Sequence, residues 1–169
     1  EIWFDGDPVS LRGGARSKDI RRRSQLIFQD PHGSLNPRLT VGEIIAEPLV
    51  IHGIARNFRN SRVAEVASSV GLGTQDLGKY PPQFSGGQRQ RIAIARALVS
   101  APELVIADEP LSALDVSVQS QVINLLAELK VSQGLTYIFI SHDLSVVAYI
   151  ADRVAVMYLG RIVELGASE

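Results

Sequence analysis

Apolar residues divide the chain into strand-like and helix-like segments that alternate along the sequence. Residues 24–28, 104–107 and 135–141 each contain a continuous apolar run and are predicted as short buried strands, and residues 153–158 and 161–164 are also strand-like. Short, continuous apolar runs are typical of strands buried in a parallel sheet. Segments with helical spacing separate these runs, so the pattern predicts an α/β domain.

The predicted helices have recognisable ends. Apolar residues at positions 63, 66, 67 and 70 follow helical spacing, and Gly71 closes that helix. Ser85, with Gln88 three residues later, predicts a capping box at the start of another helix. Asp115 predicts the N-cap of a third helix that runs to Lys130.

The first half of the chain is less regular. Residues 1–9 predict a hairpin arm around an Asp-Gly turn, and residues 29–38, rich in Pro, Gly and Asn, predict a loop. Residues 41–50 have a weak helical pattern that we expect Pro48 to interrupt. The sequence thus indicates three parts: a β arm with the first core strand (1–30), an inserted helical subdomain (31–82) and the remaining α/β core (83–169).

Composition and charge exclude several classes of function. The 169 residues, 46% hydrophobic and 21% charged, suffice for one domain with its own core. A net charge of −1 provides no broad basic field, so we expect no nucleic-acid partner. Without cysteine there is no disulfide or thiolate metal site. No apolar run approaches the roughly 18 residues that span a bilayer, so we expect any membrane association to be peripheral.

Four polar motifs follow one another in the second half of the chain. Residues 84–91 read FSGGQRQR, Asp108 and Glu109 end an apolar run, residues 112–115 read SALD, and His142 ends another apolar run. A glycine-rich helix start attracts phosphate, and two acids beyond a strand end suit metal-assisted phosphoryl transfer. Each motif alone has an ordinary structural explanation, so the ordered set is what favours a functional one.

This ordered set resembles the ATP-binding-cassette (ABC) ATPase family, whose signature, Walker B strand, D-loop and switch histidine occur in this order. Gln29, after the first apolar run, is similar to the family's Q-loop glutamine. The resemblance covers essentially the whole chain. It implies an α/β fold, a partial P-loop NTPase-like ABC ATPase core, with an inserted α-helical subdomain and an N-terminal antiparallel β arm.

The resemblance also implies ATP and Mg²⁺ as ligands and a role for each motif residue. Glu109 would deprotonate the attacking water, and His142 would sense the γ-phosphate. Asp108 and Gln29 would hold Mg²⁺. The residues that would contact nucleotide are Ser85, Gly86, Gly87, Gln88, Gln29 and Asp115. Because the family's signature grips a nucleotide held by a partner, a second ABC ATPase subunit, identical or different, is implied.

The phosphate-binding loop of that family is missing from these residues. Residues 73–80, GTQDLGKY, match the P-loop pattern except at Tyr80, where Ser or Thr must bind Mg²⁺. No buried strand precedes this stretch and Pro81 follows it, so we expect a linker. With Met157 as the only methionine, we expect the chain to be a piece of a larger protein and to be inactive as an ATPase alone.

Two stretches resemble the peptide-importer branch of the family, which takes up oligopeptides, dipeptides or nickel. Residues 33–38 read GSLNPR and residues 79–84 read KYPPQF, with Phe84 where the signature commonly has leucine. The branch implies that ATP hydrolysis powers transmembrane permease subunits at the cytoplasmic face of the inner membrane. We expect residues 29–50 to dock on the permease, or alternatively their apolar side chains to pack within the helical subdomain: Leu35, Leu39, Val41, Ile44 and Ile45.

Two other functions stay open. A soluble ABC-type ATPase of DNA repair or translation would carry coiled-coil, zinc or basic insertions, and the sequence has none of these. A non-catalytic regulatory subunit tends to lose the residues found here as Glu109 and His142.

Overall fold

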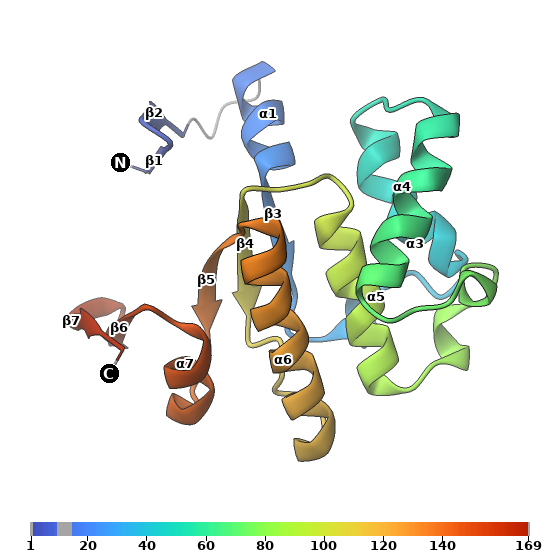
Figure 1. The fold of residues 1–169 in the computed structure, drawn as a ribbon. Helices are drawn as coiled ribbons and strands as arrows, with labels where there is room; N and C mark the ends of the chain where they lie inside the picture. Colours follow the sequence, from blue (N-terminus) through green and yellow to red (C-terminus); the bar gives the residue numbers. More distant parts are fainter. Residues whose placement is uncertain (1, 10–14, 169) are drawn as a thin grey trace.

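A parallel three-stranded sheet lies at the centre of the computed structural model, which describes residues 2–9 and 15–168 (Figure 1). Strands β3 (Ser24–Ile27), β4 (Leu104–Asp108) and β5 (Thr136–Ile140) lie in the order β3-β4-β5. In the register, Leu26 pairs with Ile106 and Ile106 pairs with Ile138. All three strands therefore end at the same edge of the sheet.

The two faces of this sheet differ in burial. Ile27, Val105 and Ala107 belong to the same buried cluster as the apolar side chains of helices α5 (Gly86–Leu98) and α6 (Val116–Gln133). Leu26 and Ile138 are 37% and 50% exposed. Because successive side chains of a strand point to opposite faces, one face is covered and the other is open. The prediction of fully buried strands is confirmed for one face only.

Two helices form the inserted subdomain, α3 (Val41–Ile51) and α4 (Arg56–Ser69). Thr40 begins α3 with a capping box, in which its Oγ1 accepts from the Glu43 amide and its own amide donates to the Glu43 carboxylate. These hydrogen bonds hold the pKa of Glu43 below its ordinary value. The helix continues through Pro48, so the expected interruption is wrong. Pro48 removes a single backbone donor at the start of the last turn.

The apolar residues that we expected on a docking surface lie inside this subdomain. Leu35, Val41, Ile44 and Ile45 are at most 3% exposed, and Leu39 packs partly buried against the same cluster. Their burial corrects the docking prediction in favour of internal packing. Within α3, α4 and the turn that joins them, the large exposed apolar side chains lie around the end of α3 and the start of α4: Val50, Ile51, Ile54 and Phe58.

The structure contains two helices that the sequence pattern does not predict. Helix α1 (Ala15–Arg23) leads directly into β3 and is mostly polar, so it has no apolar stripe to reveal it. Helix α2 (Pro31–Ser34) is a single turn within the expected loop, with Pro31 at its first position. Two 3₁₀ turns, η1 (Thr74–Asp76) and η2 (Pro81–Gln83), lie in the expected linker.

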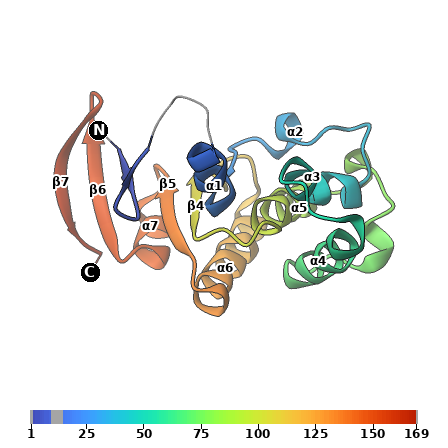
Figure 2. The same ribbon diagram turned by 90° about the horizontal axis from the view of Figure 1, so that it is seen from above.

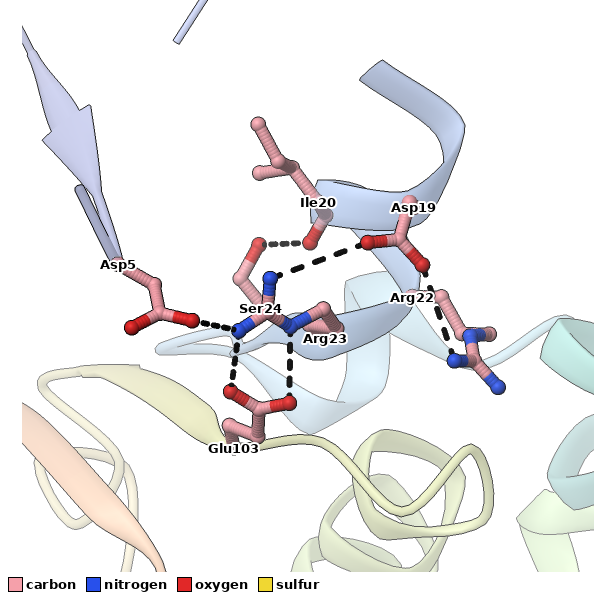
Figure 3. A network of polar contacts seen from close by, with 7 residues as sticks. All are labelled: Asp5, Asp19, Ile20, Arg22, Arg23, Ser24 and Glu103. Atoms are coloured by element: carbon pink, nitrogen blue, oxygen red, sulfur yellow. Dashed lines mark hydrogen bonds and ion pairs between the residues drawn. The ribbon is translucent and has the colours of Figure 1, made fainter. Parts of the chain in front are cut away.

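Arg23, the last residue of α1, joins three segments of the chain (Figure 3). Its Nε and Nη2 donate to the two carboxylate oxygens of Glu103 at 2.8 and 2.7 Å, and Nη2 also lies 2.6 Å from Asp5 Oδ2. These guanidinium hydrogen bonds hold the pKa of Glu103 below its ordinary value. The network therefore links the N-terminal hairpin and α1 to the residue that precedes β4.

Two antiparallel pairs complete the fold. Strand β1 (Trp3–Phe4) pairs with β2 (Asp7–Pro8), as the Asp-Gly turn predicts. After helix α7 (Leu144–Ile150), strand β6 (Arg153–Tyr158) pairs with β7 (Arg161–Ala167). Seen from above, the β6–β7 pair lies at the opposite end of the molecule from α3 and α4 (Figure 2). Among the described residues, no helix has both the length and the apolar character needed to cross a membrane.

Candidate functional site

Side chains from three strand ends meet at the carboxyl edge of the parallel sheet. Gln29 follows β3 by two residues, Glu109 follows β4 directly, and His142 follows β5 by two residues. The Gln29 Nε2 donates to Glu109 Oε2 at 2.8 Å, and His142 Nδ1 lies 3.2 Å from Glu109 Oε1. The parallel register thus brings three predicted site residues into direct contact. We refer to these three side chains as the Glu109 cluster.

The backbone at Glu109 is unusual. Its φ of 43° lies in the left-handed region, which residues other than glycine rarely adopt. The Glu109 amide donates to Ile140 O at 3.0 Å, and its carbonyl accepts from Ser112 Oγ at 3.0 Å. Backbone strain of this kind concentrates at functional sites. Here it accompanies a carboxylate held between an amide and an imidazole.

Asp108 and Gln29 supply oxygen atoms beside this cluster. Within the described part of the chain, the exposed Asp108 carboxylate and the Gln29 Oε1 have no hydrogen-bond partner. Carboxylate oxygens, together with phosphate oxygens and water, are the ligands that Mg²⁺ takes. The described residues include no group of three His, Cys, Asp or Glu side chains that could hold a metal by themselves. The donor set therefore fits a Mg²⁺ ion that phosphate and water also coordinate.

Gln119 holds the loop between β4 and α6 from inside. Its Nε2 donates to Leu114 O at 2.9 Å and to Leu111 O at 3.1 Å.

Asp115 occupies the N-cap position of α6, as predicted. Its side chain makes no capping hydrogen bond, however, so the prediction is right about the position and wrong about the hydrogen bond. A cavity of about 50 Å³ lies between this loop and His142. The sequence pattern does not identify Gln119 as a residue that stabilises this loop. The feature that could have indicated it is a glutamine in the first turn of α6, whose side chain is long enough to reach back to the loop carbonyls.

The predicted capping box at the signature is confirmed. Ser85 Oγ accepts from the Gln88 amide at 3.3 Å, and Gln88 Oε1 accepts from the Ser85 amide at 3.0 Å. Helices α5 and α6 begin at the end of the molecule where the three parallel strands end (Figure 1). Among the described residues, no hydrogen bond or ion pair joins Ser85 or Gln88 to the Glu109 cluster. The signature and the cluster therefore share one end of the molecule without direct polar contact.

The two signature glycines allow α5 to approach its neighbours closely. A Cβ on Gly86 would lie 3.6 Å from Leu114 Cδ2, which is ordinary contact. A Cβ on Gly87 would collide with Val118 Cγ1, in the first turn of α6. Gly87 therefore packs directly against the helix that follows the D-loop.

Two arginines tie α5 to the inserted subdomain. Arg91 Nη1, on α5, donates to Val70 O at 2.7 Å. Arg62, on α4, donates from Nε to Val99 O at 3.2 Å and from Nη2 to Leu98 O at 3.4 Å. Each helix thus provides an arginine for carbonyls at the other helix's C-terminal end, where no intrahelical donor is available.

The P-loop-like stretch at residues 73–80 is a linker, as predicted. Lys79 Nζ pairs with Asp76 Oδ1 at 2.6 Å, and this hydrogen bond holds the pKa of Asp76 below its ordinary value. The fully described segment 70–85 contains the two 3₁₀ turns and no strand. A phosphate-binding loop needs a strand before it and a helix directly after it, so this lysine is not part of one.

Solved structures define the class to which this fold belongs. CbiO1 of Clostridium perfringens, described as part of the ABC transporter complex cbiONQ, superposes with a TM-score of 0.86 at 29% identity, covering 98% of this chain and 65% of that one. The ATP-binding cassette MJ0796, solved as a dimer bound to ADP and Pi, gives a TM-score of 0.82 at 28% identity. The match covers 99% of this chain and 72% of that one. The chain therefore has the mixed α/β fold of ABC ATPases, which confirms the predicted fold class.

Sequence comparisons then assign the family. A family model described as "ABC transporter" matches residues 1–112, so the chain belongs to the ABC transporter family. The oligopeptide transport ATP-binding protein OppF of Bacillus subtilis (strain 168) is 54% identical over 172 residues, which cover all of this chain and 56% of that protein. The dipeptide transport ATP-binding protein DppF of Escherichia coli (strain K12) is 51% identical over 170 residues and is covered to 51%. The resemblance to the peptide-importer branch is confirmed, and the chain spans about half the length of these relatives.

Proposed function

We propose that the protein to which these residues belong binds and hydrolyses ATP and powers a membrane ABC importer of peptides. The observation that carries the proposal is the Glu109 carboxylate, held between Gln29 and His142 at the carboxyl edge of the sheet. Membership of the ABC transporter family implies nucleotide binding. The two named relatives are ATP-binding proteins of oligopeptide and dipeptide transport.

In the proposed reaction, Glu109 acts as the general base. Water attacks the γ-phosphorus in line, Glu109 accepts the proton from that water, and the bond from the γ-phosphorus to the bridging oxygen of ADP breaks. Gln29 and His142 orient the carboxylate because each contacts one of its oxygens. The His142 side chain is 75% exposed, so its imidazole is free to turn toward a γ-phosphate and to return when phosphate leaves.

Asp108 and the amide oxygen of Gln29 are the residues that would hold Mg²⁺. The ion would neutralise charge on the phosphate oxygens. Both side chains belong to the edge of the sheet that carries the proposed base, so the ligands of the ion and the base act on one nucleotide.

The signature would act on a nucleotide bound by a second ABC ATPase subunit. The start of α5 offers free N–H groups and the positive end of a helix dipole, which attract phosphate. We propose that the contacts come from residues at this start and from the D-loop: Ser85, Gly86, Gly87, Gln88 and Asp115. The dimer would be head-to-tail, peripheral to the cytoplasmic face of the membrane, with transmembrane permease subunits as further partners.

Peptide uptake tests the proposal directly. The full-length protein, expressed together with peptide-permease subunits from the same source, should co-sediment with membranes and support Mg²⁺-dependent uptake of a radiolabelled tripeptide. Uptake should disappear when this subunit is deleted and return when it is supplied in trans. Salt-sensitive DNA binding without membrane association would instead indicate an ABC-type ATPase of DNA repair.

A further inference from the structure

Arg96 extends from α5 toward the segment that carries Gln29. Its Nη1 donates at 2.6 Å to Ser34 O, the carbonyl of the last residue of α2. Carbonyls in the last turn of a helix have no intrahelical donor, and a cation is favourable there. Arg96 therefore caps the turn after Gln29 from a different helix, and that helix begins at the signature.

The same guanidinium lies close to the residue before Gln29. The Arg96 Cζ is 6.0 Å from the ring centroid of Phe28, within the range of a cation–π interaction. Phe28 directly precedes Gln29, and Ser34 ends the turn that follows it. Arg96 thus contacts the chain on both sides of Gln29, whose amide is bonded to Glu109.

The surroundings of Arg96 make these two contacts its principal partners. The side chain is half-buried, and among the described residues no carboxylate lies within ion-pair distance of it. Burial lowers the pKa of Arg96, an effect that Glu47 opposes electrostatically. Arginine remains charged at neutral pH, so the half-buried cation depends on the Ser34 carbonyl and the Phe28 ring. A lysine ammonium has no planar surface to lie over the ring while it bonds the carbonyl.

We propose that Arg96 is a positioning residue that couples the signature helix α5 to Gln29. The inference rests on the proposed function, because Gln29 holds the carboxylate of the proposed base. A displacement of α5 would be transmitted through Arg96 to Phe28 and Ser34, and so to the distance between Gln29 and Glu109. The simpler alternative is that Arg96 only stabilises the fold.

A double-mutant cycle separates coupling from stability. Steady-state ATPase activity is measured for the full-length protein carrying Arg96→Met, Gln29→Ala or both. Arg91→Met is the matched control, because the Arg91 side chain, also on α5, donates to a carbonyl, that of Val70, but makes no hydrogen bond to the described atoms of residues 28–34.

If Arg96 acts through Gln29, Arg96→Met lowers kcat about ten- to hundredfold and leaves KM for ATP within about twofold. In the Gln29→Ala background, Arg96→Met then has little further effect on kcat. The effects of Arg91→Met and Gln29→Ala on kcat, in contrast, multiply in the double variant. Arg96→Lys restores part of kcat. Multiplicative effects of Arg96→Met and Gln29→Ala would overturn the inference.

Deuterium exchange provides a readout that does not require activity. Arg96→Met should raise exchange in residues 29–35 of the full-length protein, and Arg91→Met should not. Unchanged exchange in residues 29–35 overturns the inference, whether or not the wild-type protein has ATPase activity. A lack of ATPase activity in the wild-type protein would refute only the proposed function. If Arg96→Met does not fold, Phe28→Leu takes its place in the cycle and in the exchange experiment, with a smaller effect expected in the same direction.

Discussion

The Cγ1 of Val118 lies within collision distance of the position that a Cβ on Gly87 would take. Gly87 is the second residue of α5 and Val118 the third residue of α6, so the contact joins the first turns of the signature helix and of the helix after the D-loop. Valine in a helix has one strongly preferred χ1 rotamer, so its methyl group cannot rotate away freely. Glycine is therefore required at position 87 by packing within the chain, apart from any contact with nucleotide.

Gly87→Ala should destabilise the full-length protein by about 1–3 kcal/mol, the usual effect of overpacking. Val118→Ala in the same protein should restore most of this loss, because it removes the methyl group that collides with the new Cβ. Urea unfolding of the two single variants and the double variant measures the coupling. Gly86→Ala is the control and should have a small effect, since its Cβ meets Leu114 at 3.6 Å. Additive effects at positions 87 and 118 would show that the two residues do not compete for space.

Glu109→Gln should retain ATP binding in the full-length protein and lose turnover. The amide keeps the shape of the side chain but cannot accept the proton from water, a role that typically contributes about 10²- to 10⁴-fold. ATP binding by fluorescence titration and phosphate release together check this result. The bound ATP should then hold the dimer closed, which size-exclusion chromatography detects. Turnover near the wild-type rate would assign the base to another residue.

The 169-residue chain alone should not hydrolyse ATP, because its sequence contains no G-x-x-x-x-G-K-[ST] stretch to cradle the β- and γ-phosphates. The one near match ends in Tyr80, and its Lys79 is paired with Asp76. Phosphate release by the purified chain, with and without Mg²⁺, measures this. Mg²⁺-dependent turnover that Glu109→Gln abolishes would mean that the phosphate site lies elsewhere in these residues.

The parallel sheet and its polar edge could be predicted from the sequence because their signals are local. Polar residues follow the apolar runs: Gln29, Asp108 and, after Ser141, His142. Parallel strands place their carboxyl ends at one edge of the sheet, so these residues are expected there together. Helix α1 could not be predicted, since it is a polar helix held by contacts such as the one from Arg23 to Glu103. Three-dimensional contacts also decide the roles of Gln119 and Arg96, which bond carbonyl groups that carry no sequence signal. The division into residues 1–30, 31–82 and 83–169, and the roles of the site residues, remain predictions.

Glu103→Gln should lower the melting temperature at pH 7 because it weakens the paired hydrogen bonds with Arg23. The pKa of Glu103 is lower in the folded state than its ordinary value of 4.5, so its contribution is complete above that value. The contribution is lost as the pH falls through the lower, folded-state pKa. The difference between wild type and variant, followed by circular dichroism, should therefore shrink below pH 4.5 and vanish in stronger acid. Glu128→Gln is the control, at an exposed position without an ion-pair partner among the described residues. A difference that grows in acid would contradict the assignment.

The exposed apolar side chains at the end of α3 and the start of α4 should contact the permease. Ile51 and Phe58 are 74% and 66% exposed, and neighbouring exposed apolar groups of this kind mark interaction sites. Leu35 is 3% exposed, so a charge there should unfold the subdomain and not act on a partner. Cysteines at positions 51 and 58 should therefore cross-link to the permease in membranes, while a cysteine at position 35 should not. Ile51→Asp should reduce peptide uptake and spare the ATPase activity of the isolated subunit. If neither cysteine links to the permease in any nucleotide state, the docking surface lies elsewhere on the chain.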